Sequence, residues 1–288
     1  MESIYLAAAI ALATGVVFAL SNHVQHIGLD YIDVRSGTLV NVATTAVILW
    51  LLAPLFLAPV SLTSPSAGWF ALAGLIVPSL SMTLQTLGVR MIGPGLTAGI
   101  ASTSPVFAMM IAVAVLGEVV TGPNVAGTAL VVGSIAFIAM RSRGTGASWP
   151  VWAVIIPLGA ALARGLSHNL VKLGLTDLPS PLTATLVAST TSLAVLLVVQ
   201  LASGRRLPSW SAGYPWFALT GLLNGTGLLG LNVALAFGDV VVVAPLVATV
   251  PAFTILLGWL FFKREVVTWS SAGAIALIFV GCVLVILR

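Results

Sequence analysis

The sequence has very few charged residues. Only 6% of its 288 residues are Asp, Glu, Lys or Arg, whereas a soluble domain carries about 25%. A water-soluble protein needs solvated groups over its whole surface, and this chain cannot provide them. Hydrophobic residues instead make up 59% of the chain. The composition therefore predicts an integral membrane protein and excludes a soluble globular domain.

Cysteine is also nearly absent. Cys282 is the single cysteine and lies inside an apolar run, which excludes a disulfide framework and a cysteine-based metal site. The net charge is +4, but the basic residues stand singly or in pairs, whereas a nucleic-acid-binding protein gathers them in a stripe. A phosphate-binding glycine loop of the P-loop type is missing, which argues against ATP as the energy source. We therefore expect no metal, no cofactor and no nucleic-acid partner.

Acidic residues are missing from the middle of the apolar segments. All seven lie at segment ends or in loops: Glu2, Asp30, Asp33, Glu118, Asp177, Asp239 and Glu265. A carboxylate in mid-membrane is the usual proton carrier of small multidrug pumps. Its absence favours uniport or exchange and leaves His23, His26 and His168 as the possible proton-linked residues.

Long apolar segments follow one another along the chain. A helix needs roughly 20 apolar residues to cross a bilayer. Unpaired backbone groups are not tolerated in lipid, and the alternation of barrel strands is absent, so these segments are expected to be helices. Ten are predicted, at Ile4–Ile27, Ser36–Leu57, Trp69–Gly88, Leu96–Leu116, Val125–Met140, Val151–Val171, Leu182–Leu201, Tyr214–Phe237, Val240–Phe262 and Ser270–Leu287.

Short stretches of sequence recur at a nearly constant distance. The stretch WFALAGL, beginning at Trp69, returns as WFALTGL at Trp216, and EVVT at Glu118 returns at Glu265, in both cases 147 residues later. Several such matches in order indicate a duplication. Each half contains five predicted helices, an odd number, so the second half is expected to enter the membrane upside down. The prediction is an all-α protein made of two inverted five-helix repeats, a plan common among transporters.

Two longer segments carry a family resemblance. They are SPVFAMMIAVAVLGEVVTGPNVAG, residues 104–127, and VPAFTILLGWLFFKREVVTWSSAG, residues 250–273. Each passes from a proline-containing helix into a turn with a glutamate and then into a last helix with glycine. Together with the two halves, they resemble the EamA-type members of the drug/metabolite transporter superfamily, with the aromatic amino-acid exporters as the nearest subgroup by composition and size. The resemblance implies a transporter, not an enzyme, with one EamA-like repeat in residues 1–147 and the other in 148–288.

The basic residues of the loops predict an orientation in the membrane. Lys and Arg in short loops favour the cytoplasmic side. The loops after the odd-numbered helices hold eight of them, Arg35, Arg90, Arg141, Arg143, Arg205, Arg206, Lys263 and Arg264, and the other side holds Lys172 and Arg288. We therefore expect both termini outside the cytoplasm, in a bacterial inner membrane.

Arg164 lies near the middle of the sixth predicted helix. A cation there costs about 2.5 to 3.5 kcal/mol on insertion scales, and intramembrane charges mark function by default. Ser167 and His168 follow on the same helix face. The guanidinium fork fits a carboxylate, so Arg164 is predicted to hold an anionic group of the substrate. The alternative is a structural arginine bonded to carbonyl groups at a broken helix.

Polar residues on several helices are expected to line a central cavity. Besides the group around Arg164, the predicted substrate-binding residues are Phe18, Asn22, Gln25, Ser79, Gln85, Ser104 and Asn224. The predicted hinges, where proline or glycine weakens a helix, are Pro78, Pro105, Gly225, Gly227, Pro245 and Pro251. For the polar residues the alternative is hydrogen bonding between helices, and for the glycines it is close helix packing.

These observations predict a carrier for small metabolites embedded in membrane lipid. A single deep cation fits a zwitterion with one carboxylate, which makes amino-acid export by alternating access, as uniport or exchange by a monomer, the leading hypothesis. A proton-coupled antiporter is the first alternative. A channel or structural membrane protein is the second, but an ion pore should show rings of polar or charged residues. An intramembrane enzyme would need a nucleophile with a base, or a metal set.

Overall fold

The chain is helical almost throughout. The computed structural model describes residues 2–56, 60–92, 94–141, 151–203, 211–262 and 269–287, and these ranges contain no β-strand. Nine helices in them are long and apolar enough to cross a membrane, and a tenth span is assembled from shorter pieces. The prediction of an all-α membrane protein with ten spans is confirmed.

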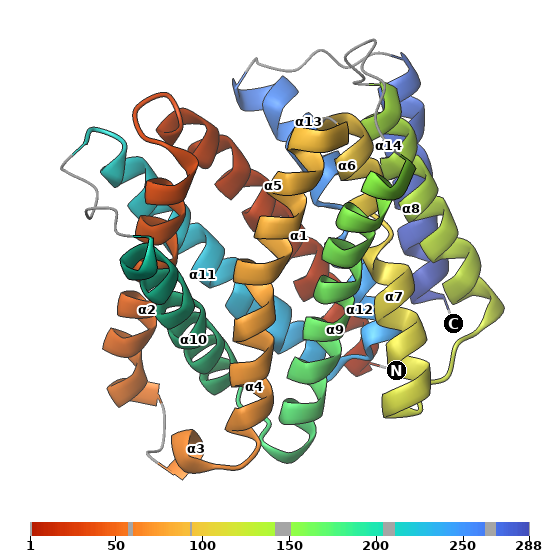
Figure 1. Ribbon diagram of the computed structural model, residues 1–288. Helices are drawn as coiled ribbons and strands as arrows, with labels where there is room; N and C mark the ends of the chain where they lie inside the picture. Colours follow the sequence, from red (N-terminus) through yellow and green to blue (C-terminus); the bar gives the residue numbers. More distant parts are fainter. Residues whose placement is uncertain are drawn as a thin grey trace.

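The helices follow one another with short connections (Figure 1). The first half contains α1 (Glu2–Gly28), α2 (Val34–Phe56), α3 (Val60–Thr63), α4 (Ala67–Gly74), η1 (Leu75–Leu80), α5 (Ser81–Ile92), α6 (Pro94–Ala101), α7 (Ser104–Ile111), η2 (Ala112–Leu116) and α8 (Gly122–Arg141). The second half contains η3 (Val151–Val154), α9 (Ile155–Asp177), α10 (Pro181–Ala202), α11 (Tyr214–Phe237), α12 (Val240–Val247), α13 (Val250–Leu257), η4 (Gly258–Phe262) and α14 (Trp269–Ile286). The boundaries differ most from the predicted ones at α9, which continues beyond Val171 to Asp177.

The third span is broken near its middle. Val77 has a non-helical backbone (φ −126°, ψ 128°), and Pro78 follows it without an N–H to donate to the carbonyl of Gly74. The hydroxyl of Ser192, on α10, donates instead to the carbonyls of Gly74 (2.8 Å) and Val77 (3.0 Å). The break therefore leaves neither carbonyl unpaired in the membrane.

The fourth and ninth spans are interrupted in the same way as each other. α6 and α7 meet at Thr103, two residues before Pro105, and α12 and α13 meet at Thr249, two residues before Pro251. Each threonine hydroxyl donates to a carbonyl three residues earlier, that of Ile100 at 2.7 Å in one case and of Leu246 at 2.6 Å in the other. The interruptions coincide with two of the predicted hinge prolines.

Contacts in one half recur in the other. Ser192 donates to the carbonyl of Gly74, and Thr45 donates to that of Gly221 (2.7 Å). Both members of one pair lie 147 residues from the corresponding members of the other. The internal duplication seen in the sequence is thus present in the packing, with α1 to α8 corresponding to α9 to α14.

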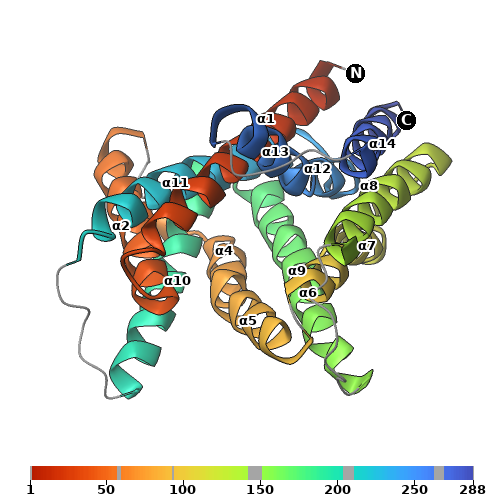
Figure 2. The same cartoon turned by 90° about the horizontal axis from the view of Figure 1, so that it is seen from above.

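The helices form two main groups. α1 packs on α11, α12 and α13, and its counterpart α9 packs on α4, α5, α6 and α7. α2 and α10 lie beside each other, and α8 packs on α14 at one side of the bundle (Figure 2). The marks for both chain ends lie at the same end of the bundle (Figure 1). This end is called the terminal end below.

Asp33 starts the second span at the opposite end. Its carboxylate accepts the backbone N–H groups of Arg35 and Ser36, both at 3.1 Å, which are donors that a helix start leaves unpaired. The hydrogen bonds with Ser36 and Arg35 lower the pKa of Asp33, so the cap is charged at neutral pH.

Candidate functional site

Arg164 lies at the middle of the membrane-spanning part of α9. The span runs from Trp152 to Asp177, which places Arg164 about 18 Å along the helix from either end. Its Nε donates to the Ser81 hydroxyl at 3.1 Å, and that hydroxyl donates to the carbonyl of Ala160 (3.3 Å). Ser81 is buried and is the first residue of α5, directly after the break in the third span. One edge of the guanidinium is therefore fixed by a neighbouring helix.

The Arg164 guanidinium has more donors than its bond to Ser81 uses. A guanidinium has five N–H donors, and the bond to Ser81 uses one of them. The side chain is partly exposed, and among the described residues no carboxylate pairs with it. The carbonyls freed at the helix break are bonded by Ser192, not by Arg164. Both the anion-binding role and the structural role of Arg164 stay predictions.

The residues that follow Arg164 have different surroundings. Ser167 is buried, and His168 is half-buried with an Nδ1 atom that is fully enclosed and has no hydrogen-bond partner among the described residues. Asn169 turns away from them and donates to the carbonyls of Ala108 on α7 (3.0 Å) and Gly165 (2.8 Å). His168 lies one helical turn after Arg164.

His23 makes a bond that matches the one made by Asn169. Its Nε2 donates to the carbonyl of Thr254 on α13 at 2.9 Å, while Asn169 donates to the carbonyl of Ala108 at 3.0 Å. Donors and acceptors are each 146 residues apart. Beside it, Asn22 is exposed and its amide reaches the Thr254 hydroxyl at 3.5 Å. The structure thus places His23 in the contact between α1 and α13, where it links two helices.

Phe18 occupies the position in the first half that Arg164 occupies in the second. Its ring packs on Gly227 so closely that a Cβ there would lie 2.6 Å from the Phe18 Cε1 atom. Gly227 in turn corresponds to Ser81, 146 residues earlier. At the corresponding place in the first repeat, the hydrogen bond between Arg164 and Ser81 is therefore replaced by the packing of the Phe18 ring against Gly227.

Other predicted residues are spread over several helices. Asn224 accepts from the Ser21 hydroxyl (2.8 Å) and donates to Asn41 (3.3 Å), so it joins α11 to α1 and α2. The rest of the described ones are Gln25, Gln85 and Ser104, which are half-buried, His26, which is exposed, the buried Pro105, Gly225 and Pro245, and the half-buried Pro251. The side chains of Pro78 and Ser79 lie outside the described residues. No three His, Cys, Asp or Glu residues in the described part come together as a metal site.

A hollow of about 470 Å³ lies away from these residues, between α8 and α14. Its walls are mainly apolar and include small residues of α8, such as Gly133 and Ser134, and of α14, such as Ser270 and Gly273. Arg164 does not contribute to it. The central cavity expected from the sequence stays a prediction.

Sequence reasoning missed two charged residues at the terminal end. The Glu118 carboxylate accepts the N–H groups of Val240 and Val241, both at 2.9 Å. Lys172 Nζ donates to the carbonyls of Leu235 (2.8 Å) and Gly238 (2.7 Å). The sequence marked Glu118 only as a landmark of the repeat and Lys172 only as a loop charge. The sequence offered one signal for Lys172. It lies eight residues after Arg164, a spacing that places both cations toward one face of the same helix.

Burial raises the pKa of the Glu118 carboxyl above its ordinary value. The bonds from Val241 and Val240 act in the opposite direction, the nearby charge of Asp239 adds to the increase, and Lys172 opposes it. Desolvation is the largest of these effects, so this carboxyl takes up a proton more readily here than in water.

Comparison with known proteins identifies the family. One solved structure, described only as the crystal structure of a protein, superposes with a TM-score of 0.77 over 99% of this chain and 96% of its own, at 17% sequence identity. At that identity the likeness concerns the fold alone. No curated protein matches the chain. The model of the EamA-like transporter family matches twice, over residues 4–140 and 151–287, which agrees with the repeated contacts described above. The chain therefore belongs to the EamA-like transporter family, whose members are membrane transporters of small substrates.

Proposed function

We propose that this transporter exports small zwitterionic metabolites, with amino acids first, by uniport or exchange through alternating access. The observation that carries the proposal is Arg164, a partly exposed cation at mid-membrane that no described carboxylate neutralises. Such a charge is costly in an apolar surrounding unless a ligand or water satisfies it. A substrate carboxylate bound by the guanidinium edge would do so with two parallel hydrogen bonds.

The number of cations at mid-membrane favours a cargo with one carboxylate over a cargo with several negative charges. Arg164 is the only cation near the middle of a described span, because Lys172 lies toward the end of α9 and donates to backbone carbonyls. Polyphosphates and nucleotide sugars would need several cations. The apolar contact of Phe18 with Gly227 occupies the corresponding position in the other repeat and would suit an uncharged part of the cargo.

The absence of acids from the interior of the described spans favours exchange over proton coupling. Asp177 is the one acid within a described span, and it is the last residue of that span. In addition, His23, one of the possible proton-linked residues, is bonded to the Thr254 carbonyl and links α1 to α13. Counterflow in proteoliposomes should therefore persist without an imposed pH gradient. Strict dependence on a gradient would favour the proton-coupled antiporter instead.

A ligand comparison tests the carboxylate directly. L-Phenylalanine should raise the melting temperature of the purified protein, and L-phenylalaninamide, which lacks only the carboxylate charge, should not. Arg164→Lys keeps the cation but removes the fork, so it should weaken the stabilisation by about tenfold in ligand concentration. A panel of other amino acids and their amides extends the comparison. Equal stabilisation by acid and amide would refute the proposed role of Arg164.

A further inference from the structure

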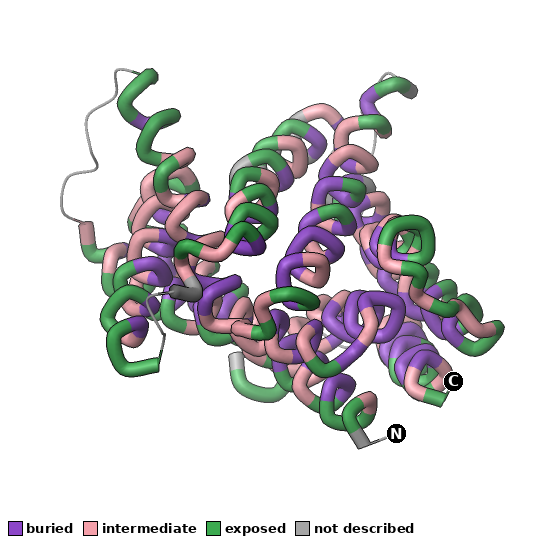
Figure 3. Tube along the Cα trace, turned by 90° about the horizontal axis from the view of Figure 1, so that it is seen from below, coloured by how far each residue is buried: buried purple, intermediate pink, exposed green. Residues whose placement is uncertain are grey.

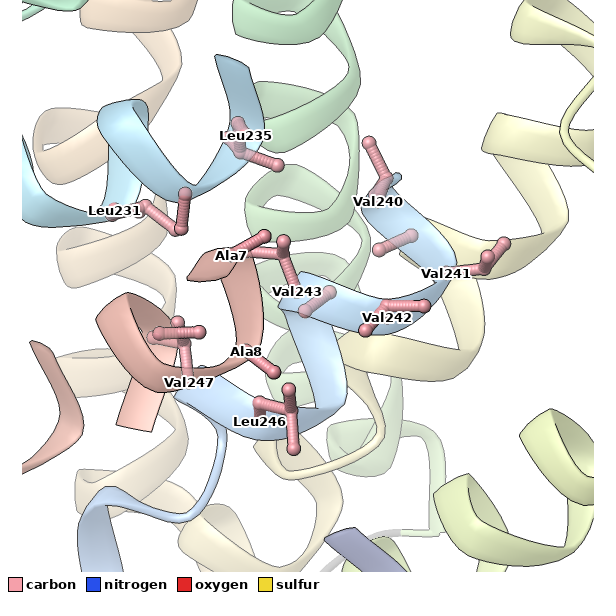
Figure 4. Close-up of a cluster of buried hydrophobic side chains, with 14 of the residues drawn as sticks. Ala7, Ala8, Leu231, Leu235, Val240, Val241, Val242, Val243, Leu246 and Val247 are labelled. Atoms are coloured by element: carbon pink, nitrogen blue, oxygen red, sulfur yellow. The ribbon is translucent and has the colours of Figure 1, made fainter. Parts of the chain in front are cut away.

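The terminal end of the bundle is tightly packed. Every residue of α12 is buried. Its valines belong to the same cluster of buried side chains as Ala7 and Ala8 of α1 and Leu231 and Leu235 of α11 (Figure 4). Seen from below, exposed and half-buried residues lie beside the marks for the two chain ends, and buried segments lie farther inside the bundle (Figure 3). Apolar packing therefore seals this end between the group around α1 and the group around α9.

Glu118 adds a polar link across this seal. It belongs to the connection between η2 and α8, and its carboxylate accepts the first N–H groups of α12. Asp239 holds the N-cap position of α12, but its side chain does not cap the helix. Glu118 thus supplies the acceptor that a helix start needs, from the other group of helices.

Lys172 adds a second link at the same corner. It extends from α9 to the carbonyls of Leu235 and Gly238, at the end of α11. Carbonyls at a helix end lack partners within the helix and favour a cation. The two links therefore hold both sides of the corner between α11 and α12. Glu118 accepts from the N–H groups that begin α12, and Lys172 donates to the carbonyls at the end of α11.

The positions equivalent to Glu118 and Lys172 in the repeat lie toward the opposite end. The counterpart of Lys172 in the first repeat is His26, which is exposed. α1 packs on α11, α12 and α13 but has no substantial contact with α5 or α6, whereas α9 packs on α11 and α12. Glu265, the counterpart of Glu118, lies outside the described residues.

We propose that Glu118 and Lys172 form a gate that holds the terminal end closed and must release the corner between α11 and α12 before that end can open. The gate rests on transport by alternating access and does not depend on which cargo is carried. Both residues are positioning residues, because they act on helix ends and not on the cargo.

A buried thiol measures the opening of this gate. In a Cys282→Ala background, Val243→Cys places a thiol on α12 where the native side chain is fully buried. A maleimide can react with it in the purified protein only when the terminal end opens. Glu118→Ala leaves two N–H groups without an acceptor, and Lys172→Met leaves two carbonyls without a donor. Each should speed labelling by about tenfold.

Two controls separate gating from general loosening. Glu118→Gln retains one acceptor oxygen and should return labelling toward the native rate. Asp30→Ala removes an exposed acid at the opposite end and should leave the rate unchanged. Melting temperatures of the variants show whether each is folded.

Some results would overturn the gate. These are native labelling rates in both Glu118→Ala and Lys172→Met, or an equal increase in Asp30→Ala. Because labelling needs no cargo, a failure of the amino-acid proposal leaves this test intact. Conversely, a failed gate leaves the ligand comparison at Arg164 intact.

Discussion

Two equivalent helix contacts in this transporter have opposite chemistry. Between α9 and α5, Arg164 donates to Ser81; between α1 and α11, at the positions related by the repeat, Phe18 packs on Gly227. A duplicated bundle thus presents a cation on one side and an aromatic ring on the other. The difference teaches that the repeat preserves the packing frame, while the residues at the middle of the membrane have diverged.

The backbone differs at the same level. Pro78 breaks the third span, whereas Gly225, 147 residues later, keeps its N–H and lies inside the continuous α11. The carbonyls of Gly74 and Gly221 nevertheless accept equivalent hydroxyl groups from α10 and α2. One repeat therefore has a broken helix beside its arginine, and the other has a continuous helix beside its phenylalanine.

Removing each member of the contrasting pair should affect transport very differently. We expect Arg164→Ala to lower amino-acid counterflow by at least tenfold, because two charge-assisted hydrogen bonds to the cargo are lost. Phe18→Ala should lower it by less than about threefold, since it removes apolar contact only. Both rates are measured in proteoliposomes at matched protein content. Similar losses in the two variants would erase the functional difference between the repeats.

Substitutions at the equivalent glycines Gly74 and Gly221, where helices pack closely in both repeats, should instead have similar effects. A Cβ added to Gly74 would overlap the backbone of Ala188, and one added to Gly221 would overlap that of Asn41. Gly74→Ala and Gly221→Ala should each lower stability by about 1 to 3 kcal/mol. The measurement is the melting temperature in detergent. Gly133→Ala is the matched control, because its Cβ would meet open space.

The opening of the terminal end should respond to pH. Burial raises the pKa of Glu118 at the closed gate, so the closed state binds a proton more tightly than an open state with a solvated carboxyl. Acid therefore stabilises closure, and this stabilisation is lost as the pH rises through the raised pKa. Labelling of Val243→Cys should slow as the pH falls from neutral toward the raised pKa of Glu118.

The rate must be divided by that of the same protein with Glu118→Gln, which removes the pH dependence of the maleimide reaction itself. A ratio that stays constant over this range would exclude Glu118 as the titrating group of the gate.

The smallest effect is expected where the two repeats use different residues for one bond. His23→Asn replaces a side chain by the one found at the equivalent position, Asn169, which bonds the equivalent carbonyl. Stability should change by less than about 1 kcal/mol, and counterflow should remain. Loss of counterflow with intact folding would return His23 to the list of proton-linked residues.

The spans, the repeat and the isolated arginine could be predicted from the sequence because each depends on local hydropathy or on a fixed offset. The break at Val77 could also be predicted, since Pro78 lacks the backbone N–H that a helix needs. The roles of the polar residues on α1 could not be predicted. A polar residue in an apolar segment avoids lipid, but only packing decides whether it meets a cavity or another helix, as His23 does.

The link made by Glu118 was hidden for a different reason. Its partners Val240 and Val241 lie more than 120 residues away and contribute backbone N–H groups, which every residue but proline has. A pattern of side chains in the sequence therefore cannot predict a backbone partner of this kind. Only the meeting of a turn with a helix start in space reveals it.

The hydroxyl of Ser192 at the bend of the third span has a mechanical consequence. Because α10 holds both carbonyls freed at the bend, it cannot slide along the bent helix without exposing them to an apolar surrounding. These two helices must therefore travel as one body, however the rest of the molecule rearranges. A rearrangement that moved α4 and η1 and left α10 behind would break this connection first.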